Sequence, residues 1–165
     1  MRYKVDRRNK FTMNVYDKAP DFTLPDQNAK TVRLKDFRGK TVILFFFPKA
    51  DTPGCTIEAC GFREAYRKLG QAGAVVLGIS ADAPATQKKF ETKYDLPYTL
   101  LSDVDKKVAE AYGVLKEKNM YGKKVKGIAR TTFVIDGEGK IAHVFNQVKA
   151  EGHAGEVLEY LTRTP

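Results

Sequence analysis

The sequence predicts an α/β fold in which helices flank a mixed central β-sheet. Two continuous apolar runs, Thr41–Phe47 and Ala74–Ser80, are rich in β-branched and aromatic residues, which is typical of strands covered on both faces. A segment with apolar residues at helical spacing follows each run, and the last third of the chain adds a hairpin and a closing helix. Parallel strands joined by helices and followed by a hairpin form a sheet of mixed direction.

Local patterns predict the remaining elements. In chain order they are strands at Phe22–Leu24 and Thr31–Leu34, a helix from Pro53 to about Gly70, a helix at 82–95, a strand at Tyr98–Asp103, a short helix at Val104–Tyr112, two strands around Asp136–Gly139 and a helix at Gly152–Thr162. This order best fits a thioredoxin-like sandwich. Cys55 then lies just outside the carboxyl end of the first long strand, where open α/β sheets place their sites.

Length and composition fit one globular domain. The 165 residues are enough to bury a core without disulfides, and 42% apolar and 30% charged residues are ordinary values for such a domain. No apolar stretch reaches the roughly 20 residues that a membrane span requires, and no apolar core follows the basic start. We expect a cytoplasmic protein with a single domain at 13–165, preceded by a basic arm, residues 1–12, that is disordered or vector-derived.

The net charge of +9 invites a nucleic-acid interpretation. However, the 29 Lys and Arg residues are dispersed among 20 acidic residues. The densest clusters, Lys4–Lys10 and Lys116–Lys126, carry neither zinc-finger spacing nor an RNA-binding aromatic signature. We therefore expect a solvated basic surface with weak affinity for polyanions, and no specific nucleic-acid or membrane partner.

The chain has two cysteines, Cys55 and Cys60, placed in and just after a turn rich in Pro and Gly. With Thr52 as the N-cap and Pro53 as the first helical residue, Cys55 falls in the first turn of a helix. Unpaired backbone N–H groups and the positive end of the helix dipole favour a thiolate there. Ionisation alone is worth about 2 kcal/mol, whereas enzymes usually supply about 8 kcal/mol or more, so further groups must stabilise the transition state.

These residues resemble a known family. Pro48, Thr52 and Cys55 fit the peroxiredoxin signature P-x-x-x-T-x-x-C, and FPKADTPGCTIEACGF resembles the bacterioferritin comigratory protein, or Q-type, subfamily. Similar segments, GISADAP, YTLLSD and RTTFVIDGEGKI, extend the resemblance from about Ala19 onward. The resemblance implies a thiol-dependent peroxidase that reduces hydrogen peroxide and organic hydroperoxides and needs no prosthetic group.

The resemblance also implies roles for individual residues. Cys55 matches the peroxidatic nucleophile, which attacks the hydroperoxide and becomes a sulfenic acid. Thr52 and Arg130 match the residues that bind the peroxide oxygens, and a guanidinium suits the charge that develops on the departing oxygen. Pro48 matches the residue that shields the sulfur from water, and Glu58 matches a carboxylate that orients the arginine. Taken singly, Thr52 could be only a cap, Pro48 a strand terminator and Arg130 a surface base.

The spacing of the two cysteines sets a geometric condition. In an ideal helix the Cα atoms of residues i and i+5 are about 8.7 Å apart, whereas a disulfide needs them within roughly 7 Å. A Cys55–Cys60 bond therefore requires unwinding, and Gly61 weakens this turn by about 1 kcal/mol relative to Ala. By resemblance to Q-type members, Cys60 is the resolving cysteine, and thioredoxin or a similar dithiol protein reduces the disulfide. Those relatives are monomers or weak homodimers.

Other classes of function remain as alternatives. A thiol-disulfide oxidoreductase of similar fold predicts C-x-x-C and a cis-proline, whereas here the spacing is longer and Arg130 and Thr131 precede the later strand. A redox-switched basic binding module, or a passive pair of buried thiols, would need no peroxide chemistry. A zinc site would need both cysteines with His143 and His153, but this spacing is unfamiliar, and surface histidines are expected instead.

Overall fold

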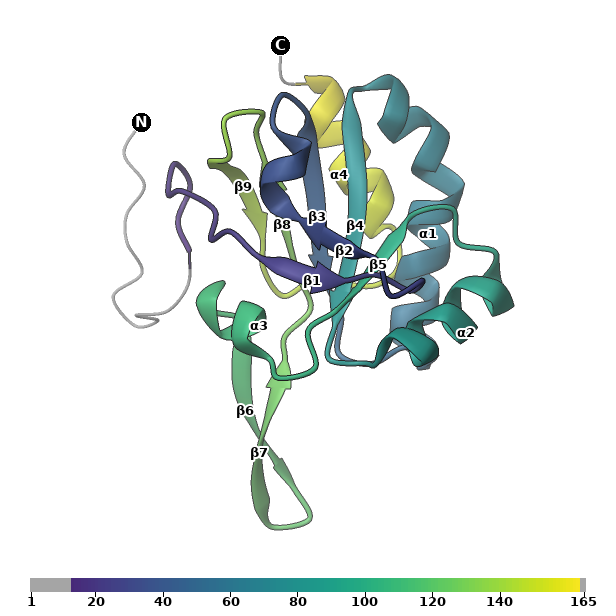
Figure 1. The fold of residues 1–165 in the computed structure, drawn as a ribbon, viewed down its shortest axis with the longest axis vertical. Coiled ribbons are helices and arrows are strands. Elements are labelled where there is room, and N and C mark those ends of the chain that lie inside the picture. The colour runs from purple at the N-terminus through teal and green to yellow at the C-terminus, as the bar shows by residue number, and fades with distance from the viewer. Residues whose placement is uncertain (1–12, 164–165) are drawn as a thin grey trace.

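A computed structural model describes residues 13–163 of the chain (Figure 1). Residues 1–12, where the sequence predicts a basic arm, lie outside the described residues. In chain order the elements are β1 (Thr23–Pro25), β2 (Thr31–Arg33), the 3-10 helix η1 (Leu34–Phe37), β3 (Thr41–Phe46), α1 (Pro53–Gln71), β4 (Ala74–Ser80), α2 (Pro84–Tyr94), β5 (Thr99–Ser102), α3 (Lys107–Ala111), β6 (Leu115–Met120), β7 (Lys123–Ile128), β8 (Thr131–Ile135), β9 (Ile141–Phe145) and α4 (His153–Arg163).

A five-stranded sheet in the order β5-β4-β3-β8-β9 forms the centre of the fold (Figure 1). The strands β3, β4 and β5 run parallel, with α1 and α2 as their connections. The strand β8 pairs antiparallel with β3, and β9 pairs antiparallel with β8. The predicted mixed sheet is confirmed, and the hairpin around Asp136–Gly139 supplies its antiparallel strands.

The strand β3 shows why the sheet is covered on both faces. Ile43 and Phe45 belong to one apolar cluster and Leu44 and Phe46 to another, and all four side chains are fully buried. Successive side chains of a strand point to opposite faces, so an unbroken apolar run is stable only with cover on both sides.

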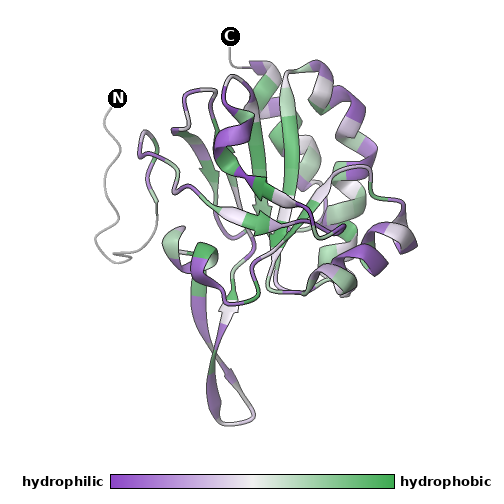
Figure 2. Ribbon diagram, in the orientation of Figure 1, coloured by the Kyte–Doolittle hydropathy of each residue, from purple (hydrophilic) through white to green (hydrophobic). Residues whose placement is uncertain are grey.

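Different elements provide the two covers. Helices α1 and α4 pack against each other on one face and supply Phe62, Leu69 and Val157 to its cluster. The N-terminal segment and α3 cover the other face, where Phe22 and Tyr112 are buried. Figure 2 shows apolar residues concentrated in the sheet and polar residues on the outer sides of the helices. Within residues 13–163, no helix has the length and apolar character needed to cross a membrane.

Helix α1 begins and ends close to the predicted positions. Thr52 occupies the N-cap with an extended backbone and Pro53 is the first helical residue, while the helix ends at Gln71, before Gly73 with its φ of +83°. The Thr52 side chain makes no capping hydrogen bond to the helix within the described chain. Its hydroxyl instead donates to the Lys49 carbonyl oxygen at 2.7 Å. The predicted cap is therefore correct for the backbone and wrong for the side chain.

Most bounds shift by one or two residues from those predicted, and two of the differences have a clear physical cause. The second strand stops one residue early, since Leu34 opens η1 and buries its side chain there. The helix expected at Val104–Tyr112 is confined to α3. Asp103 fixes its start, because the carboxylate accepts the backbone N–H groups of Val108 and Ala109 at 3.2 and 2.8 Å.

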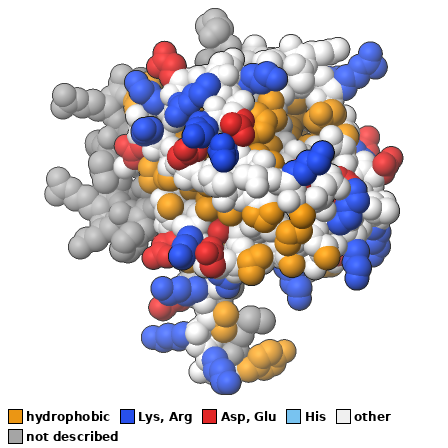
Figure 3. All heavy atoms as spheres, viewed as in Figure 1, with side chains coloured by type: hydrophobic (Ala, Val, Ile, Leu, Met, Phe, Trp, Pro, Cys, Tyr) orange, Lys and Arg blue, Asp and Glu red, His pale blue; other side chains and the backbone are white. Residues whose placement is uncertain are grey.

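Sequence patterns did not predict the hairpin formed by β6 and β7, where Lys116–Lys126 stood out only as a basic cluster. The two strands pair antiparallel along their whole length. Figure 1 shows the hairpin projecting from the end of the sheet, and Figure 3 shows basic side chains on it and scattered over the rest of that face. The strand β7 ends two residues before Arg130.

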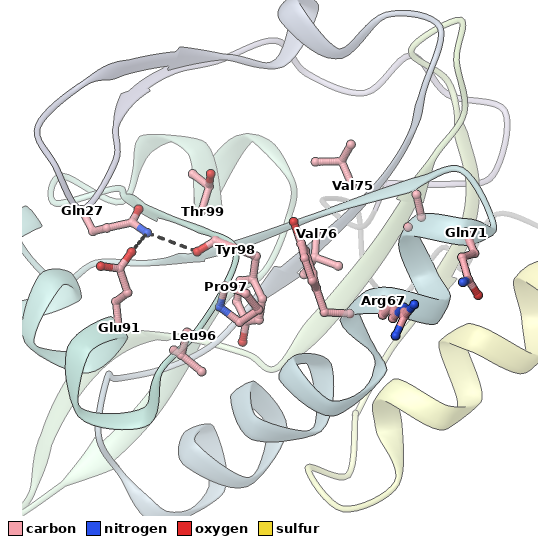
Figure 4. Close-up of a pocket in the computed structure, with 13 residues that line it drawn as sticks. Gln27, Arg67, Gln71, Val75, Val76, Glu91, Leu96, Pro97, Tyr98 and Thr99 are labelled. Atoms are coloured by element: carbon pink, nitrogen blue, oxygen red, sulfur yellow. Dashed lines mark hydrogen bonds between the residues drawn. The ribbon is translucent and has the colours of Figure 1, made fainter.

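Gln27, in the predicted N-terminal turn, fastens that turn to the edge of the sheet (Figure 4). Its side-chain amide donates to the Tyr98 carbonyl oxygen at 3.1 Å, accepts the Leu100 N–H at 2.9 Å and also bonds Glu91 of α2. Gln27, Tyr98 and Glu91 border a cleft of about 790 Å³, which the C-terminal end of α1 also lines. None of the six candidate site residues, all within the described chain, borders this cleft.

Candidate active site

The pairing of β3 with β8 brings Arg130 beside the chain that carries Cys55. Phe46, the last residue of β3, pairs with Thr131, the first residue of β8. The residue before β8 therefore lies level with the chain as it leaves β3 and turns into α1, of which Cys55 is the third residue. Sheet register thus brings together two residues that are 75 positions apart.

Three side chains form the centre of the site, which we call the Cys55 cluster: Cys55, Glu58 and Arg130. Arg130 Nη2 donates to Cys55 Sγ at 3.5 Å, and Arg130 Nη1 donates to Glu58 Oε1 at 2.9 Å. Cys55 and Glu58 are each 1% exposed, whereas the Arg130 side chain is 18% exposed. Cys55 and Glu58 share one face of α1 because they are three residues apart. One guanidinium therefore contacts both a sulfur and a carboxyl group, and it remains accessible from solvent.

Charge in the cluster depends on burial and on contact. Burial raises the pKa of Glu58 to about 7, although Arg130 opposes this shift. Burial also acts to lower the pKa of Arg130, but the neighbouring Glu58 and Cys55 outweigh it and the net shift is upward. Glu58 Oε2 is buried and has no hydrogen-bond partner among the described residues. Glu58 therefore changes its charge near neutral pH while Arg130 stays positive.

Gly54 admits Arg130 to this position, which sequence patterns did not reveal. A Cβ atom at residue 54 would lie 2.9 Å from Arg130 Nη2, the nitrogen that contacts Cys55. Any side chain at residue 54 would therefore displace the guanidinium. Glycine is a poorer helix former than alanine, by up to about 1 kcal/mol, and its presence inside a predicted helix was the sequence signal of a close approach.

His153 is buried, so its predicted surface position is wrong. It is 1% exposed, its Nε2 lies 2.7 Å from Thr132 Oγ1, and its ring meets Phe62 and Phe145 edge-on. The reason is that α4, which begins at His153, packs across α1. Burial and the nearby Arg130 lower the pKa of His153 to about 4, which leaves it neutral at pH 7. Within residues 13–163, no group of three or more His, Cys, Asp or Glu side chains is arranged to hold a metal.

The other three candidate site residues lie before and after Cys55 along the chain. Pro48 is half-buried two residues beyond β3, and Thr52 immediately precedes α1. Cys60 is half-buried, and both cysteines carry free thiols within one continuous helix. Because five helical residues make about one and a half turns, Cys60 lies away from the face that presents Cys55 to Arg130.

Comparisons with known proteins identify the family. Residues 15–144 match the AhpC/TSA family. The chain is 54% identical over 147 residues to a putative peroxiredoxin Bcp of Coxiella burnetii. This alignment covers 89% of this chain and 97% of the relative. It is 49% identical over 145 residues to peroxiredoxin Bcp of Escherichia coli, with 88% and 93% covered.

A solved structure shares the fold and concerns peroxide chemistry. It is that of the Xanthomonas campestris bacterioferritin comigratory protein, in trapped intermediate and ligand complexes that bear on its alkyl peroxide reduction activity. The TM-score is 0.82 at 36% identity, over 86% of this chain and 90% of that one. The thioredoxin-like fold is thus confirmed, and fold and relatives together define a thiol-dependent peroxidase. The chain belongs to the AhpC/TSA family, among the peroxiredoxins of the Bcp, or Q, type.

Proposed function

We propose that Cys55 is the peroxidatic nucleophile, which reduces hydrogen peroxide and organic hydroperoxides. The observation that carries this proposal is the 3.5 Å contact between Cys55 Sγ and Arg130 Nη2. The sulfur lies in the first turn of α1, near unpaired backbone N–H groups, and faces a guanidinium, so positive charge surrounds the reacting atom. In the reaction an S–O bond forms as the O–O bond breaks, which leaves a sulfenic acid on Cys55 and releases water or an alcohol. Arg130 stabilises the negative charge on the departing oxygen.

Thr52 and Pro48 complete the proposed peroxide site. The Thr52 hydroxyl proton points to the Lys49 carbonyl oxygen, so Thr52 Oγ1 accepts the O–H of the hydroperoxide rather than donating to it. Pro48 lacks a backbone N–H, and its half-buried ring excludes water from the approach to the sulfur.

Glu58 acts through Arg130 in this proposal. Its Oε1 accepts the bond from Arg130 Nη1, which leaves Nη2 directed at the sulfur. Glu58 is therefore a positioning residue that fixes the orientation of the guanidinium. Glu58 is 1% exposed, so water does not compete with Arg130 for its carboxylate.

Cys60 is the proposed resolving cysteine. Its thiol attacks the sulfenic sulfur of Cys55, an S–S bond forms and water leaves. Because both residues lie in α1 in the reduced protein, the start of this helix unwinds for the bond to close. Thioredoxin or a similar dithiol protein then reduces the disulfide.

Two further proposals concern substrate and context. The activity named for the Xanthomonas campestris relative supports organic hydroperoxides as substrates beside hydrogen peroxide. The relatives are bacterial, and we infer a cytoplasmic peroxidase that works as a monomer or weak homodimer.

Stopped-flow oxidation of the reduced protein by several peroxides, followed by mass spectrometry, tests the proposal. Wild-type protein should yield a Cys55–Cys60 disulfide. Cys55→Ser should abolish peroxide consumption, whereas Cys60→Ser should retain the first oxidation and lose thioredoxin-coupled turnover. Persistent peroxide consumption in the Cys55 variant would reject the nucleophile, and full turnover in the Cys60 variant would reject the resolving role. Insulin reduction, or submicromolar salt-dependent DNA binding, without peroxidase activity would instead favour one of the alternative functions.

A further inference from the structure

The loop before Cys55 is held against the end of α2 by contacts outside the Cys55 cluster. The Asp51 carboxylate accepts hydrogen bonds from Lys93 Nζ at 2.8 Å and from the Tyr94 hydroxyl at 2.6 Å. Lys93 and Tyr94 are the last two residues of α2, which lies beside the start of α1 in Figure 1. We call these three residues the Asp51 tether.

The backbone of Asp51 explains why this tether acts on the reactive turn. Asp51 has a φ of +58°, in the left-handed region where the chain reverses direction before it enters α1. Fixing the Asp51 side chain therefore fixes the direction from which the chain approaches Thr52 and Cys55. The hydrogen bonds from Lys93 and Tyr94 also lower the pKa of Asp51, so the carboxylate stays charged at neutral pH.

Tyr94, at the end of α2, also holds helix α1 beyond Cys60. Arg63 Nη1 donates to the Tyr94 carbonyl oxygen at 2.6 Å. The segment that contains both cysteines is thus fastened to Tyr94 at its two ends, by the Tyr94 side chain before Cys55 and by its backbone after Cys60. Between these ends, the Tyr98 hydroxyl donates to the Ala59 carbonyl oxygen at 2.7 Å.

We propose that the Asp51 tether keeps this segment wound until Cys55 is oxidised, and that its release allows Cys60 to reach the sulfenic acid. Asp51, Lys93 and Tyr94 are then positioning residues for the resolving step. This inference rests on the two-cysteine cycle proposed above. The Arg63 contact lies beyond Cys60, so it persists and limits how far α1 unwinds.

The tether controls a competition between two reactions of the sulfenic acid. In one, the Cys60 thiol forms the S–S bond and water leaves, which requires unwinding. In the other, a second hydroperoxide molecule transfers an oxygen to the sulfur, giving a sulfinic acid and water or an alcohol, with the helix still wound. A firmer tether therefore favours overoxidation at high peroxide concentration, and a looser tether favours the disulfide.

Exposure makes the tether easy to release. The side chains of Asp51 and Lys93 are 42% and 58% exposed, so water replaces their hydrogen bonds when the loop moves. Removing one such contact should raise the opened population about twofold to fivefold. The ratio of sulfinic acid to disulfide should fall by the same factor, because only the disulfide reaction needs the opened form.

Two variants and one matched control test the tether. Tyr94→Phe removes the hydroxyl and keeps both the edge-on contact with Phe90 and the carbonyl that Arg63 binds. Lys93→Met removes the cation. Lys88→Met is the control, because the exposed Lys88 also lies in α2 and pairs with a carboxylate of the same helix, that of Glu91, at 2.6 Å without contacting the loop.

The measurement is a single turnover without reductant. Reduced protein is mixed with graded hydrogen peroxide, quenched in acid and analysed by intact mass for disulfide and sulfinic acid. The ratio of sulfinic acid to disulfide should fall about twofold to fivefold in Tyr94→Phe and Lys93→Met and stay unchanged in Lys88→Met. An unchanged or raised ratio in both tether variants would overturn the proposed role of the Asp51 tether and leave the two-cysteine cycle intact. A wild-type protein that forms no Cys55–Cys60 disulfide would overturn the proposed cycle and the tether with it.

Discussion

Cys55 and Cys60 lie in one helix, five residues apart, yet their surroundings differ. Cys55 is 1% exposed and receives a direct bond from Arg130. Cys60 is half-buried. Arg63 and Tyr98 lie within electrostatic range of Cys60, but neither donates a hydrogen bond to it. The same residue type in the same helix therefore meets a cation in two different ways.

Position in the helix accounts for the rest of the difference. Cys55 is the third residue of α1, where backbone N–H groups lack partners within the helix, while Cys60 lies in the interior, where they are already bonded. In the proposed cycle, the sulfur that attacks the peroxide benefits from unpaired N–H donors and a neighbouring cation. A sulfur that only has to reach a neighbouring sulfenic acid needs mobility, which partial exposure allows.

Replacing Arg130 should break this contrast most strongly. Arg130→Met removes the donor to Cys55 and should lower kcat/KM for peroxide by about 100-fold to 1,000-fold, the usual effect of deleting one donor to a developing oxyanion. Second-order oxidation rates from stopped-flow measurements check this. Arg63→Met, on the Cys60 side, is the control and should leave the first oxidation within about threefold of wild type. Equal losses in both variants would contradict the assignment.

Gly54→Ala should lower the rate at which Cys55 reacts with peroxide while it stabilises helix α1. The new methyl group would displace Arg130 Nη2 and lower kcat/KM for peroxide about tenfold, since small misplacements of catalytic groups are costly. The free energy of unfolding should rise by up to about 1 kcal/mol, because alanine is the better helix former. Gly70→Ala, also in α1 but with no neighbour within 4 Å of the added Cβ, should gain the stability and keep the activity. Equal activity in the two variants would show that Gly54 has no role in admitting Arg130.

Gly61→Ala should change only the second step, in which Cys60 closes the disulfide. Its Cβ would meet Ala154 Cβ at 3.6 Å, an ordinary contact, so the main effect is a stiffer helix after Cys60. A gain of about 1 kcal/mol in the wound state should slow disulfide closure about fivefold. The first oxidation should not change, and acid-quenched mass spectrometry separates the two steps. If closure keeps its rate, the segment that unwinds does not include this turn.

Glu58→Gln should have the smallest effect on activity. Its main effect should be on the pH dependence of the free energy of unfolding. Gln keeps an acceptor for Arg130, so kcat/KM at pH 7 should remain within about threefold of wild type. In the wild type the raised pKa of Glu58, about 7 against an ordinary 4.5, makes the folded state bind more protons than the unfolded state between these values. Its contribution to the free energy of unfolding is therefore fully present below pH 4.5 and is lost as pH rises toward 7.

Denaturant unfolding from pH 4 to 8 measures this contribution as the difference between wild type and the Gln variant. His153, whose pKa is lowered to about 4, has the opposite dependence, since its contribution is lost as pH falls from 6.5 to 4. The subtraction removes it because both proteins retain His153. Parallel stability curves would show that Glu58 titrates normally.

The β6–β7 hairpin shows why part of the fold escaped sequence patterns. Strand prediction relies on an apolar face that alternates with a polar one. Within β7, Lys123–Lys126 is wholly exposed, so burial imposes no such alternation there. Among the residues of β7, all of which the structure describes, only Ile128 at the base of the hairpin is buried. By contrast, β3 is packed on both sides, and its pattern is unmistakable.

The sequence by itself determined that Cys55 opens a helix after a buried strand, because capping, proline geometry and apolar runs act over a few residues. Only the tertiary structure decided that Arg130 meets the sulfur, since that contact depends on the register of β3 with β8 across 75 positions. Gly54, the burial of Glu58 and the Asp51 tether also arise from elements that meet in space. Contacts of this kind depend on the packing of distant segments, which no local pattern encodes.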